Sequence, residues 1–362
     1  MAAKRFIKFM MLVDTLRFVH PTALDEYMEK TQQPITILGA GSWGTALALH
    51  LSRKGQSVRL WEHDRIRAIT MQTERVNVRY LPDFVFPPSL QTIVDLHEAV
   101  SGIQDILIAV PSSAFHELLL KLKPLILTKT RIIWATKGLD AETGHLLHDV
   151  AIDVLGKEHL YAVISGPSFA KEVAAGLPTA VVAASEDLTL AQDLVNRFNS
   201  DVFRVYSSPD MIGVEIGGIV KNVLAIATGI SDGMKFGANA RSALITRGLA
   251  EMMRLGIGLG GKPETFMGLA GLGDLVLTCT DNQSRNRRFG IALGEKKNSF
   301  DAAREIGQVV EGSLNAELII QLAKKHGIEM PITEAVCDIL RGNLTPVEAM
   351  HQLFSREPKT EF

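Results

Sequence analysis

One short stretch constrains the fold of this chain more than any other part of the sequence. Residues 35–38 form the strand-like run Ile-Thr-Ile-Leu, and the pattern Gly-x-Gly-x-x-Gly follows directly at Gly39, Gly41 and Gly44. Gly39 permits a tight turn from strand to helix, Gly41 lets a pyrophosphate approach the backbone, and Gly44 lets the next helix lie close to the strand. Because an apolar helical pattern begins at once, the stretch predicts the dinucleotide-binding turn of a doubly wound α/β sheet.

A second strand-like run, residues 57–61, ends at Glu62. That position is close to the offset at which an acidic residue accepts hydrogen bonds from the ribose of a dinucleotide. A carboxylate there favours a ribose diol and repels a 2′-phosphate, whereas His63, Arg65 and Arg67 would offset the repulsion. The two effects have opposite signs, so the residues predict NAD(H) or NADP(H) without deciding between them.

The first half of the chain alternates strand-like and helical patterns. Several strand-like runs are apolar on both faces, as in parallel strands covered by helices on each side. This alternation predicts a Rossmann-type doubly wound sheet in a domain of residues 34–208. The expected strands are residues 35–38, 58–62, 92–94, 105–110, 131–136, 161–165, 179–184 and 203–206, with helices at 113–127 and 188–199.

The second half of the chain changes character and reads as an all-α domain of residues 209–355. We expect the frequent glycines of residues 256–273 to serve as turns and helix ends. The polar residues 356–362 form a tail. The expected helices are residues 214–229, 239–255, 301–305, 315–326, 332–341 and 346–353.

Composition narrows the class of protein. The chain has 362 residues, enough for two or three domains, and a net charge of −2 gives no electrostatic reason to expect nucleic acid as a partner. Only two cysteines are present, Cys279 and Cys337. They form neither a disulfide framework nor a zinc-binding pattern, so we expect a cytoplasmic protein without a metal site.

Residues 1–33 precede the first strand and carry none of the motifs. They begin with a few cations and an apolar run, which resembles a signal peptide, but Asp14 and Arg17 interrupt the run and no small-residue cleavage site follows. The run is also too short and too charged to span a bilayer, so no membrane insertion is expected. We interpret residues 1–33 as an extension outside the fold, or as the result of a start codon assigned too early. Deleting residues 1–27 should then leave turnover unchanged.

Two further loops leave strands at the sheet edge where ligands of such folds collect. One loop carries Lys137 directly after residues 131–136, and a lysine there can contact a phosphate or a carbonyl oxygen. The other carries Gly166 and Ser168, which can offer backbone or hydroxyl donors. The alternatives are a solvated loop lysine and ordinary turn chemistry.

Lys221 lies in an otherwise apolar helical run, and its neighbours at helical spacing are Gly217, Gly218 and Ala225. The small residues leave room for a ligand or another backbone. A lysine in this setting is partly desolvated, which lowers its pKa and suits it to proton transfer near neutral pH. The alternative is a snorkelling lysine at the domain junction.

A third cluster follows the glycine-rich region. Asp274 could orient a lysine or cap a turn, and Arg285, Arg287 and Arg288 stand at the start of an expected helix. Arginine forks suit bidentate contacts with phosphate. A solvated basic face is the alternative.

Taken together, these motifs resemble the bacterial NAD(P)-dependent glycerol-3-phosphate dehydrogenases. The resemblance spans about residues 35–353 and is carried by six stretches, residues 39–46, 136–139, 165–170, 217–223, 271–275 and 284–286. It implies that a hydride passes between the nicotinamide and C2 of dihydroxyacetone phosphate, giving sn-glycerol 3-phosphate for phospholipid synthesis. It also implies a homodimer, and the use of both cofactors with a leaning to NADPH.

The resemblance also implies roles for individual residues. Lys221 would be the proton donor, and Arg285 would hold the substrate phosphate. The substrate site would contain Lys137, Gly166, Ser168, Lys221, Asp274, Ser284, Arg285 and Asn286. The cofactor site would contain Gly39, Gly41, Ser42, Trp43, Gly44, His63, Lys137, Ala170, Arg285, Val309 and Glu311.

Two other functions stay open from the residues alone. A β-hydroxyacid-type dehydrogenase acting on a carboxylate would share the glycine turn and a helical lysine. A redox sensor that binds a dinucleotide would need the fold without the chemical residues, which the joint presence of Lys137, Lys221 and Arg285 disfavours.

Overall fold

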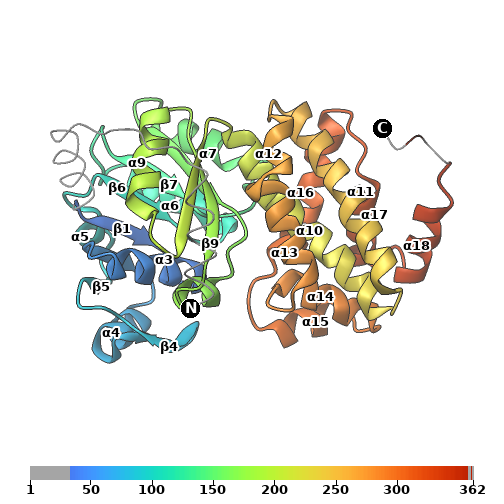
Figure 1. Ribbon diagram of the computed structural model, residues 1–362, viewed down its shortest axis with the longest axis horizontal. Coiled ribbons are helices and arrows are strands. Elements are labelled where there is room, and N and C mark those ends of the chain that lie inside the picture. The colour runs from blue at the N-terminus through green and yellow to red at the C-terminus, as the bar shows by residue number, and fades with distance from the viewer. Residues whose placement is uncertain (1–32, 358–359, 361–362) are drawn as a thin grey trace.

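The computed structural model describes residues 33–357 and residue 360, and it divides into a sheet half and a helical half that lie side by side (Figure 1). The interpretation of residues 1–33 as an extension falls almost entirely outside the described residues, so it stays a prediction.

The sheet half is built on eight strands in the order β5-β2-β1-β6-β7-β8-β9-β10. The chain order reverses between β1 and β6, which places the ligand crevice at the carboxyl ends of these two strands. The strands are β1 Ile35–Leu38, β2 Val58–Trp61, β5 Leu90–Ile93, β6 Asp105–Ile108, β7 Arg131–Trp134, β8 Leu160–Ser165, β9 Thr179–Ala184 and β10 Phe203–Ser208. All eight expected strands are confirmed, with ends that differ by a few residues.

The direction of the last two strands differs from the expected parallel arrangement. Strand β9 pairs antiparallel with β8, and β10 runs parallel to β9. The connection of residues 166–178 contains only the five-residue helix α8 (Ala170–Ala174). Such a connection does not carry the chain across a sheet face to the opposite edge, because parallel crossovers commonly need a longer helix. The chain therefore returns along β8 in the opposite direction.

Helices cover both faces of the sheet, which explains why the strands are apolar on both sides. One face is packed against α3 (Ser42–Arg53), α8 and α9 (Leu188–Phe198). The other is packed against α5 (Leu96–Val100), α6 (Phe115–Leu122) and α7 (Leu147–Leu155). The sequence does not predict the small hairpin of β3 (Val76–Asn77) and β4 (Leu81–Val85), which follows α4 (Arg65–Glu74), because β3 has two residues and β4 contains Pro82 and Asp83 and is mostly not buried.

Helix α10 (Met211–Gly233) lies at the centre of the helical half, and nearly all of its residues are buried. Among the described residues it is the one helix long and apolar enough to cross a membrane, but 89% of its apolar window is buried inside the fold, as in a core helix. The helices around it are α11 Gly237–Gly258, α12 Pro263–Met267, α13 Asp274–Thr280, α14 Arg285–Gly294, α15 Ser299–Ile306, α16 Glu311–Lys325, α17 Pro331–Arg341 and α18 Pro346–Phe354.

The glycine-rich region between α11 and α13 is more helical than expected. The sequence predicts turns and helix ends over residues 256–273, whereas the structure has α12 and a π-helical turn, Leu269–Gly273, in this region. A Cβ on Gly271 would lie 2.2 Å from the carbonyl oxygen of Phe266. Gly271 therefore allows two backbone segments to pack closely within a helical region. A glycine in such a region looks the same in the sequence as a glycine in a turn.

Helices α10 and α14 approach each other through glycines. A Cβ on Gly290 of α14 would lie 2.2 Å from the carbonyl oxygen of Ile226, and one on Gly229 of α10 would lie 2.2 Å from that of Arg287. No side chain fits between backbones this close. The contact fixes α14, whose first residue is Arg285, against the helix that carries Lys221.

Candidate active site

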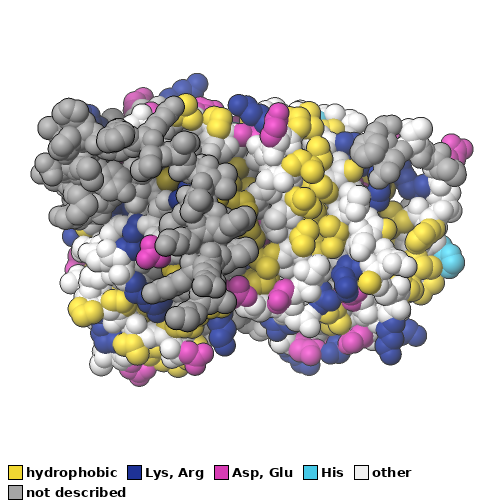
Figure 2. Space-filling model, in the orientation of Figure 1, with side chains coloured by type: hydrophobic (Ala, Val, Ile, Leu, Met, Phe, Trp, Pro, Cys, Tyr) yellow, Lys and Arg dark blue, Asp and Glu magenta, His cyan; other side chains and the backbone are white. Residues whose placement is uncertain are grey.

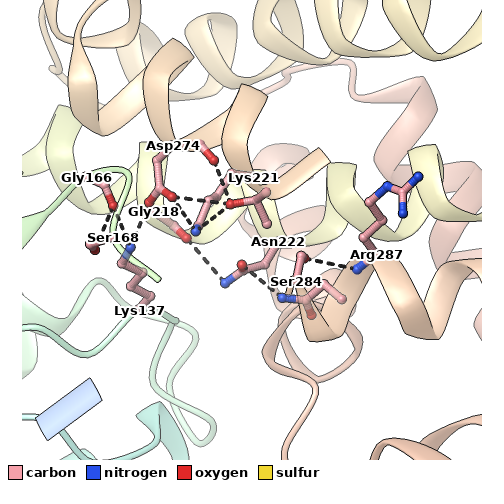
Figure 3. A network of polar contacts seen from close by, with 11 residues as sticks. Lys137, Gly166, Ser168, Gly218, Lys221, Asn222, Asp274, Ser284 and Arg287 are labelled. Atoms are coloured by element: carbon pink, nitrogen blue, oxygen red, sulfur yellow. Dashed lines mark hydrogen bonds and ion pairs between the residues drawn. The ribbon is translucent and has the colours of Figure 1, made fainter. Parts of the chain in front are cut away.

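The structure brings Lys221 into a buried polar cluster at the junction of the two halves (Figure 3). The Lys221 Nζ atom donates to Asp274 Oδ1 at 2.7 Å and to Thr278 Oγ1 at 2.9 Å. Asp274 and Thr278 lie one turn apart on α13, so both face the lysine. The expectation that Asp274 orients a lysine agrees with this geometry.

Lys137 reaches the same carboxylate from the sheet half. Its Nζ atom donates to Asp274 Oδ2 at 2.7 Å and lies 3.5 Å from the Gly166 carbonyl oxygen. Burial works to raise the pKa of Asp274, but the two ammonium groups outweigh it and lower the pKa. Asp274 is therefore an ionised carboxylate shared by two lysines from different halves of the molecule.

Burial is the main influence on the Lys221 ammonium, whose side chain is only 9% exposed. It lowers the pKa of Lys221 to about 8, helped by repulsion from Lys137 and opposed by the charge of Asp274. This direction agrees with the expectation from the small, apolar neighbours of Lys221 in the sequence. A lysine with such a pKa can give or take a proton near neutral pH.

The loop after β8 comes close to Lys137. Ser168 Oγ donates to the Gly166 carbonyl at 3.0 Å, and the same carbonyl lies beside Lys137 Nζ. Gly166 has φ of +148°, and a Cβ there would lie 2.9 Å from the Val181 Cα. Glycine is required at this turn, and its carbonyl is directed to the lysine as a result.

The N-terminus of α14 lies on the other side of Lys221. Ser284 caps α14 by accepting from the Arg287 N–H at 3.2 Å. Asn286 accepts from the Gly312 N–H at 2.9 Å and donates to Asn222 Oδ1 at 3.0 Å. Both ends of the Asn286 amide thus contact protein, and they link α10, α14 and α16.

Two of the three arginines grouped by the sequence have different roles. Arg285 Nη1 donates to Gln308 Oε1 at 3.0 Å and is partly exposed at the site. Arg287 is buried instead, and its guanidinium pairs with Asp232 at 2.5 Å. Of the two alternatives for the arginine cluster, a phosphate contact or a solvated face, neither fits Arg287, because its charge is already paired inside the helical half. Arg288 is exposed.

The glycine turn has the shape expected for a dinucleotide phosphate site. Gly39 has φ of +110°, and a Cβ on Gly44 would lie 2.0 Å from the Gly39 carbonyl oxygen, so both need glycine for the protein's own packing. A Cβ on Gly41 would meet nothing within 4 Å, so the packing of the protein does not require glycine there. Its missing side chain instead leaves the space above the turn open for a ligand. Helix α3 begins at Ser42 without a side-chain cap, and the Trp43 Nε1 atom is buried without a partner among the described residues. These free donors fit a bound pyrophosphate.

The acidic residue after β2 is not free to act alone. Glu62 is buried, and its Oε1 atom accepts from Arg67 Nη2 at 2.9 Å and from the Asp64 N–H at 3.0 Å. His63 Nδ1 lies 2.9 Å from the same oxygen, on a side chain that is 71% exposed. A guanidinium thus neutralises the carboxylate that would otherwise repel a 2′-phosphate.

The remaining cofactor candidates lie around the start of α16 and α8. Glu311 begins α16, and burial raises its pKa to about 7 against the opposing charge of Arg285. Ser112 Oγ, from the sheet half, lies 3.5 Å from Glu311 Oε2. Val309 is 42% exposed, and Ala170 begins α8. Only Glu311 among these makes a polar contact across the two halves.

Sequence reasoning missed several residues that build the junction. Gln308 contacts Arg285, and Asn315 Oδ1 accepts from the Leu139 N–H at 2.6 Å, which joins α16 to the loop after Lys137. Single polar residues of this kind have no periodic signal. Within the described range no group of three or more His, Cys, Asp or Glu side chains is placed to hold a metal ion.

Comparison with known proteins gives the same family over nearly the whole described chain. The profile of the NAD-dependent glycerol-3-phosphate dehydrogenase N-terminus matches residues 34–191, and that of the C-terminus matches residues 210–351. A glycerol-3-phosphate dehydrogenase [NAD(P)+] of Coxiella burnetii is 58% identical over 334 residues, 92% of this chain and 100% of that protein. The enzyme of the same name from Enterobacter sp. is 54% identical over 335 residues, 92% of this chain and 99% of that protein.

Comparison with solved structures supports the same family. The crystal structure of glycerol-3-phosphate dehydrogenase from Coxiella burnetii matches with a TM-score of 0.88 at 57% identity, covering 90% of this chain and 100% of that one. A ketopantoate reductase from Ralstonia eutropha, at 17% identity and a TM-score of 0.54 over 88% of this chain and 100% of that one, shares the fold alone. The sequence, the fold and the cluster around Asp274 lead to one assignment: this chain belongs to the family of NAD-dependent glycerol-3-phosphate dehydrogenases.

Proposed function

We propose that this protein catalyses the reversible, NAD(P)H-dependent reduction of dihydroxyacetone phosphate to sn-glycerol 3-phosphate, a precursor of glycerophospholipids. The family assignment supports the reaction. The observation that carries the proposal is the placement of Lys221 and Lys137 on one ionised carboxylate, next to a helix, α14, that begins at Arg285 and is linked to α10 through Asn286 and Asn222.

Lys221 is the general acid in this proposal. When bound, the reduced nicotinamide supplies the hydride that reaches C2 of the ketone. The oxygen at C2 then needs a proton, and Lys221 Nζ donates it. Asp274 and Thr278 hold the ammonium in place, since each accepts one of its N–H groups. In the reverse direction the neutral lysine accepts the proton from the alcohol.

Arg285 binds the substrate phosphate, and Lys137 contacts substrate and cofactor. A guanidinium presents a planar fork that matches phosphate oxygens, and Gln308 restrains the Arg285 side chain from one side. Gly166, Ser168, Ser284 and Asn286 complete the substrate site through backbone groups and by fixing the loop after β8 and the start of α14.

The cofactor lies along the carboxyl edge of the sheet in this proposal. Gly39, Gly41 and Gly44 shape the phosphate turn, and Ser42 and Trp43 offer donors at the start of α3. His63 contacts the adenosine end, and Ala170, Val309 and Glu311 line the nicotinamide end together with Lys137 and Arg285. NAD(H) and NADP(H) are both accepted.

The test is an absorbance assay of NADH and NADPH oxidation with dihydroxyacetone phosphate. Turnover is expected with both cofactors, and sn-glycerol 3-phosphate is the product. A β-hydroxyacid substrate at equal concentration is the comparison, and faster turnover of that carboxylate would overturn the proposal. The absence of any turnover would favour a dinucleotide-binding sensor.

We also propose a homodimer. Figure 2 shows apolar side chains gathered on the helical half, where Figure 1 draws α11, α12 and α13. These helices carry Ile257, Met267 and Val276, which are 44%, 58% and 40% exposed. Exposed apolar surface of this kind is typical of a protein interface, and a second copy of the chain is the occupant proposed. Light scattering should give a dimer mass for the native protein and a monomer mass for a variant carrying Met267→Asp and Val276→Asp.

The cytoplasm is the proposed location. Both cysteines are buried free thiols, which suits a reducing compartment. Cell fractionation of the tagged protein tests this, and recovery with a secreted or membrane fraction would contradict it.

A further inference from the structure

Glu215 is a buried acid near the start of α10 that the reaction itself does not use. Its side chain is 3% exposed. Glu215 Oε1 accepts from Trp134 Nε1 at 3.0 Å, and Oε2 lies 2.5 Å from His148 Nδ1. Trp134 ends β7 and His148 lies on α7, so both partners belong to the sheet half. Glu215 therefore links the central helix of one half to the sheet of the other.

The charge of Glu215 makes this link costly to break. Burial works to lower the pKa of His148, but the hydrogen bond and charge of Glu215 outweigh it and raise the pKa. The other charged groups that face His148 are Asp149, 3.2 Å from its Nε2 atom, and Glu186, and both favour the imidazolium as well. Removing either partner of a buried charged pair leaves the other unpaired, which is strongly destabilising.

Glu215 and the proposed general acid Lys221 lie on the same helix, α10. Gly218 lies three residues after Glu215 on α10, and Lys221 lies three residues further, so Gly218 is a neighbour of both residues on the helix surface. A Cβ on Gly218 would lie 3.1 Å from Ser165 Oγ and 3.5 Å from the Cγ and Cδ atoms of Lys137. The stem of Lys137 thus lies against α10 at Gly218, the residue midway between Glu215 and Lys221 in the chain.

This part of the junction is closely packed but leaves a small polar gap. A cavity of about 10 Å³, room for roughly one water molecule, is lined by Lys137, Ser165, Glu215 and Gly218 among others. The Ser165 hydroxyl is buried without a hydrogen-bond partner among the described side chains and backbone. The hydrogen bonds of Glu215 add a directional restraint between α10 and the end of β7 to the apolar packing of Val214 in the same cluster as Trp134.

We propose that Glu215 is a positioning residue for catalysis, which holds α10 against β7 so that Lys221 and Lys137 both reach Asp274. Trp134 donates the hydrogen bond from the sheet half and lies three residues before Lys137. The proposal rests on the proposed function, because its readout is turnover of dihydroxyacetone phosphate. A displacement of about 1 Å in a catalytic group can cost roughly 10²-fold in rate, so loss of this link should reach the chemistry.

The experiment compares Glu215→Ala with Glu215→Gln. Glutamine keeps an acceptor for Trp134 and a polar partner for His148, whereas alanine removes both. In Glu215→Ala we expect kcat to fall by about 10- to 100-fold, while the KM for NADH stays near the native value. We also expect the pKa in the kcat profile to rise toward the ordinary lysine value of 10.5, because Lys221 loses burial and the repulsion of Lys137. Glu215→Gln should restore most of kcat and the native pH profile.

A matched control comes from another buried acid in the same half. Glu251 of α11 is 1% exposed and accepts from the backbone of Ile332 and Thr333 at the start of α17, away from the junction. Glu251→Ala should lower the melting temperature as Glu215→Ala does, yet leave kcat and its pH profile unchanged in folded protein.

Failure of the proposed function and failure of the positioning role of Glu215 give different results. A native enzyme that does not reduce dihydroxyacetone phosphate refutes the proposed function. A native enzyme that does, with a folded Glu215→Ala variant that keeps native kcat and pH profile, refutes the positioning role. If Glu215→Ala does not fold, Trp134→Phe replaces it, since this variant removes only the N–H donor to Glu215. Unchanged kcat and pH profile in Trp134→Phe would then overturn the proposal.

Discussion

Lys137 and Lys221 come from different halves of the molecule, yet each ammonium lies 2.7 Å from an oxygen of the Asp274 carboxylate. Two positive charges this close repel each other unless an anion separates them. Asp274 supplies that anion, and its lowered pKa keeps it ionised throughout the neutral range. Lys221 is thus held by a charge balance that exists only when the two halves meet.

Lys221→Met should abolish most of the turnover. Methionine keeps much of the length of the stem and removes the ammonium, and loss of a general acid typically costs about 10²–10⁴ in rate. Steady-state kcat with dihydroxyacetone phosphate measures the loss, and fluorescence titration should show NADH binding with similar affinity. A variant that keeps more than about a tenth of native kcat, on the same scale, would assign the proton to another group, with Lys137 the next candidate.

The two directions of the reaction should depend on pH with opposite signs. Burial lowers the pKa of Lys221 to about 8. Ketone reduction needs the protonated lysine, so its kcat should fall as pH rises through this value. Alcohol oxidation needs the neutral lysine, so its kcat should rise over the same interval. Profiles of kcat in both directions provide the measurement, and limbs of the same sign would remove Lys221 from the proton step.

Arg285→Ala should raise the KM for dihydroxyacetone phosphate. A charge-assisted contact is worth roughly 1.5–3 kcal/mol, or about one to two decades in affinity. Arg288→Ala is the matched control, because that arginine is exposed and lies one turn further along α14. Dihydroxyacetone, which lacks the phosphate, should be a poor substrate for the native enzyme and lose little further in Arg285→Ala. Equal losses on both substrates would show that Arg285 does not bind the phosphate.

Cofactor choice should be mixed, with a leaning to NADPH that depends on Arg67. Arg67 pairs with Glu62 at 2.9 Å and so cancels the charge that would repel a 2′-phosphate. Arg67→Gln should therefore lower kcat/KM for NADPH by about tenfold or more, on the scale of one charge-assisted contact, and change that for NADH far less. Assays with each cofactor measure this. A native preference for NADH above about a hundredfold, a larger discrimination than such a contact supplies, would contradict the leaning.

Gly290→Ala should destabilise the protein even though alanine is the better helix former. Its Cβ would lie 2.2 Å from the Ile226 carbonyl oxygen, so the backbones of α14 and α10 must separate. Overpacking of this kind typically costs about 1–3 kcal/mol. Gly273→Ala is the comparison, because its Cβ would have no neighbour closer than 3.6 Å. Thermal unfolding should give a lower melting temperature for Gly290→Ala than for Gly273→Ala, and the reverse order would show that the helix contact yields easily.

The sequence by itself determined the features that repeat over short distances. Strand β1 and the three glycines after it predict the dinucleotide turn, because Gly39 and Gly44 are needed for the packing of the turn and Gly41 leaves the space above it open. Alternating strand and helix patterns predict the sheet half, and the change of period near residue 208 predicts the helical half. Lys221 was found because one charge among apolar residues is visible without any structure.

Tertiary structure alone decided which of these residues meet. Lys137 and Asp274 stand 137 residues apart, so no local pattern pairs them, and the direction of β9 depended on how much helix the connection from β8 contains. Arg285 and Arg287 look alike in sequence, yet packing against Asp232 buries one and leaves the other at the site. The physical reason is that periodicity reports which face of an element is buried, whereas the partner of a buried charge is chosen by where distant elements come together.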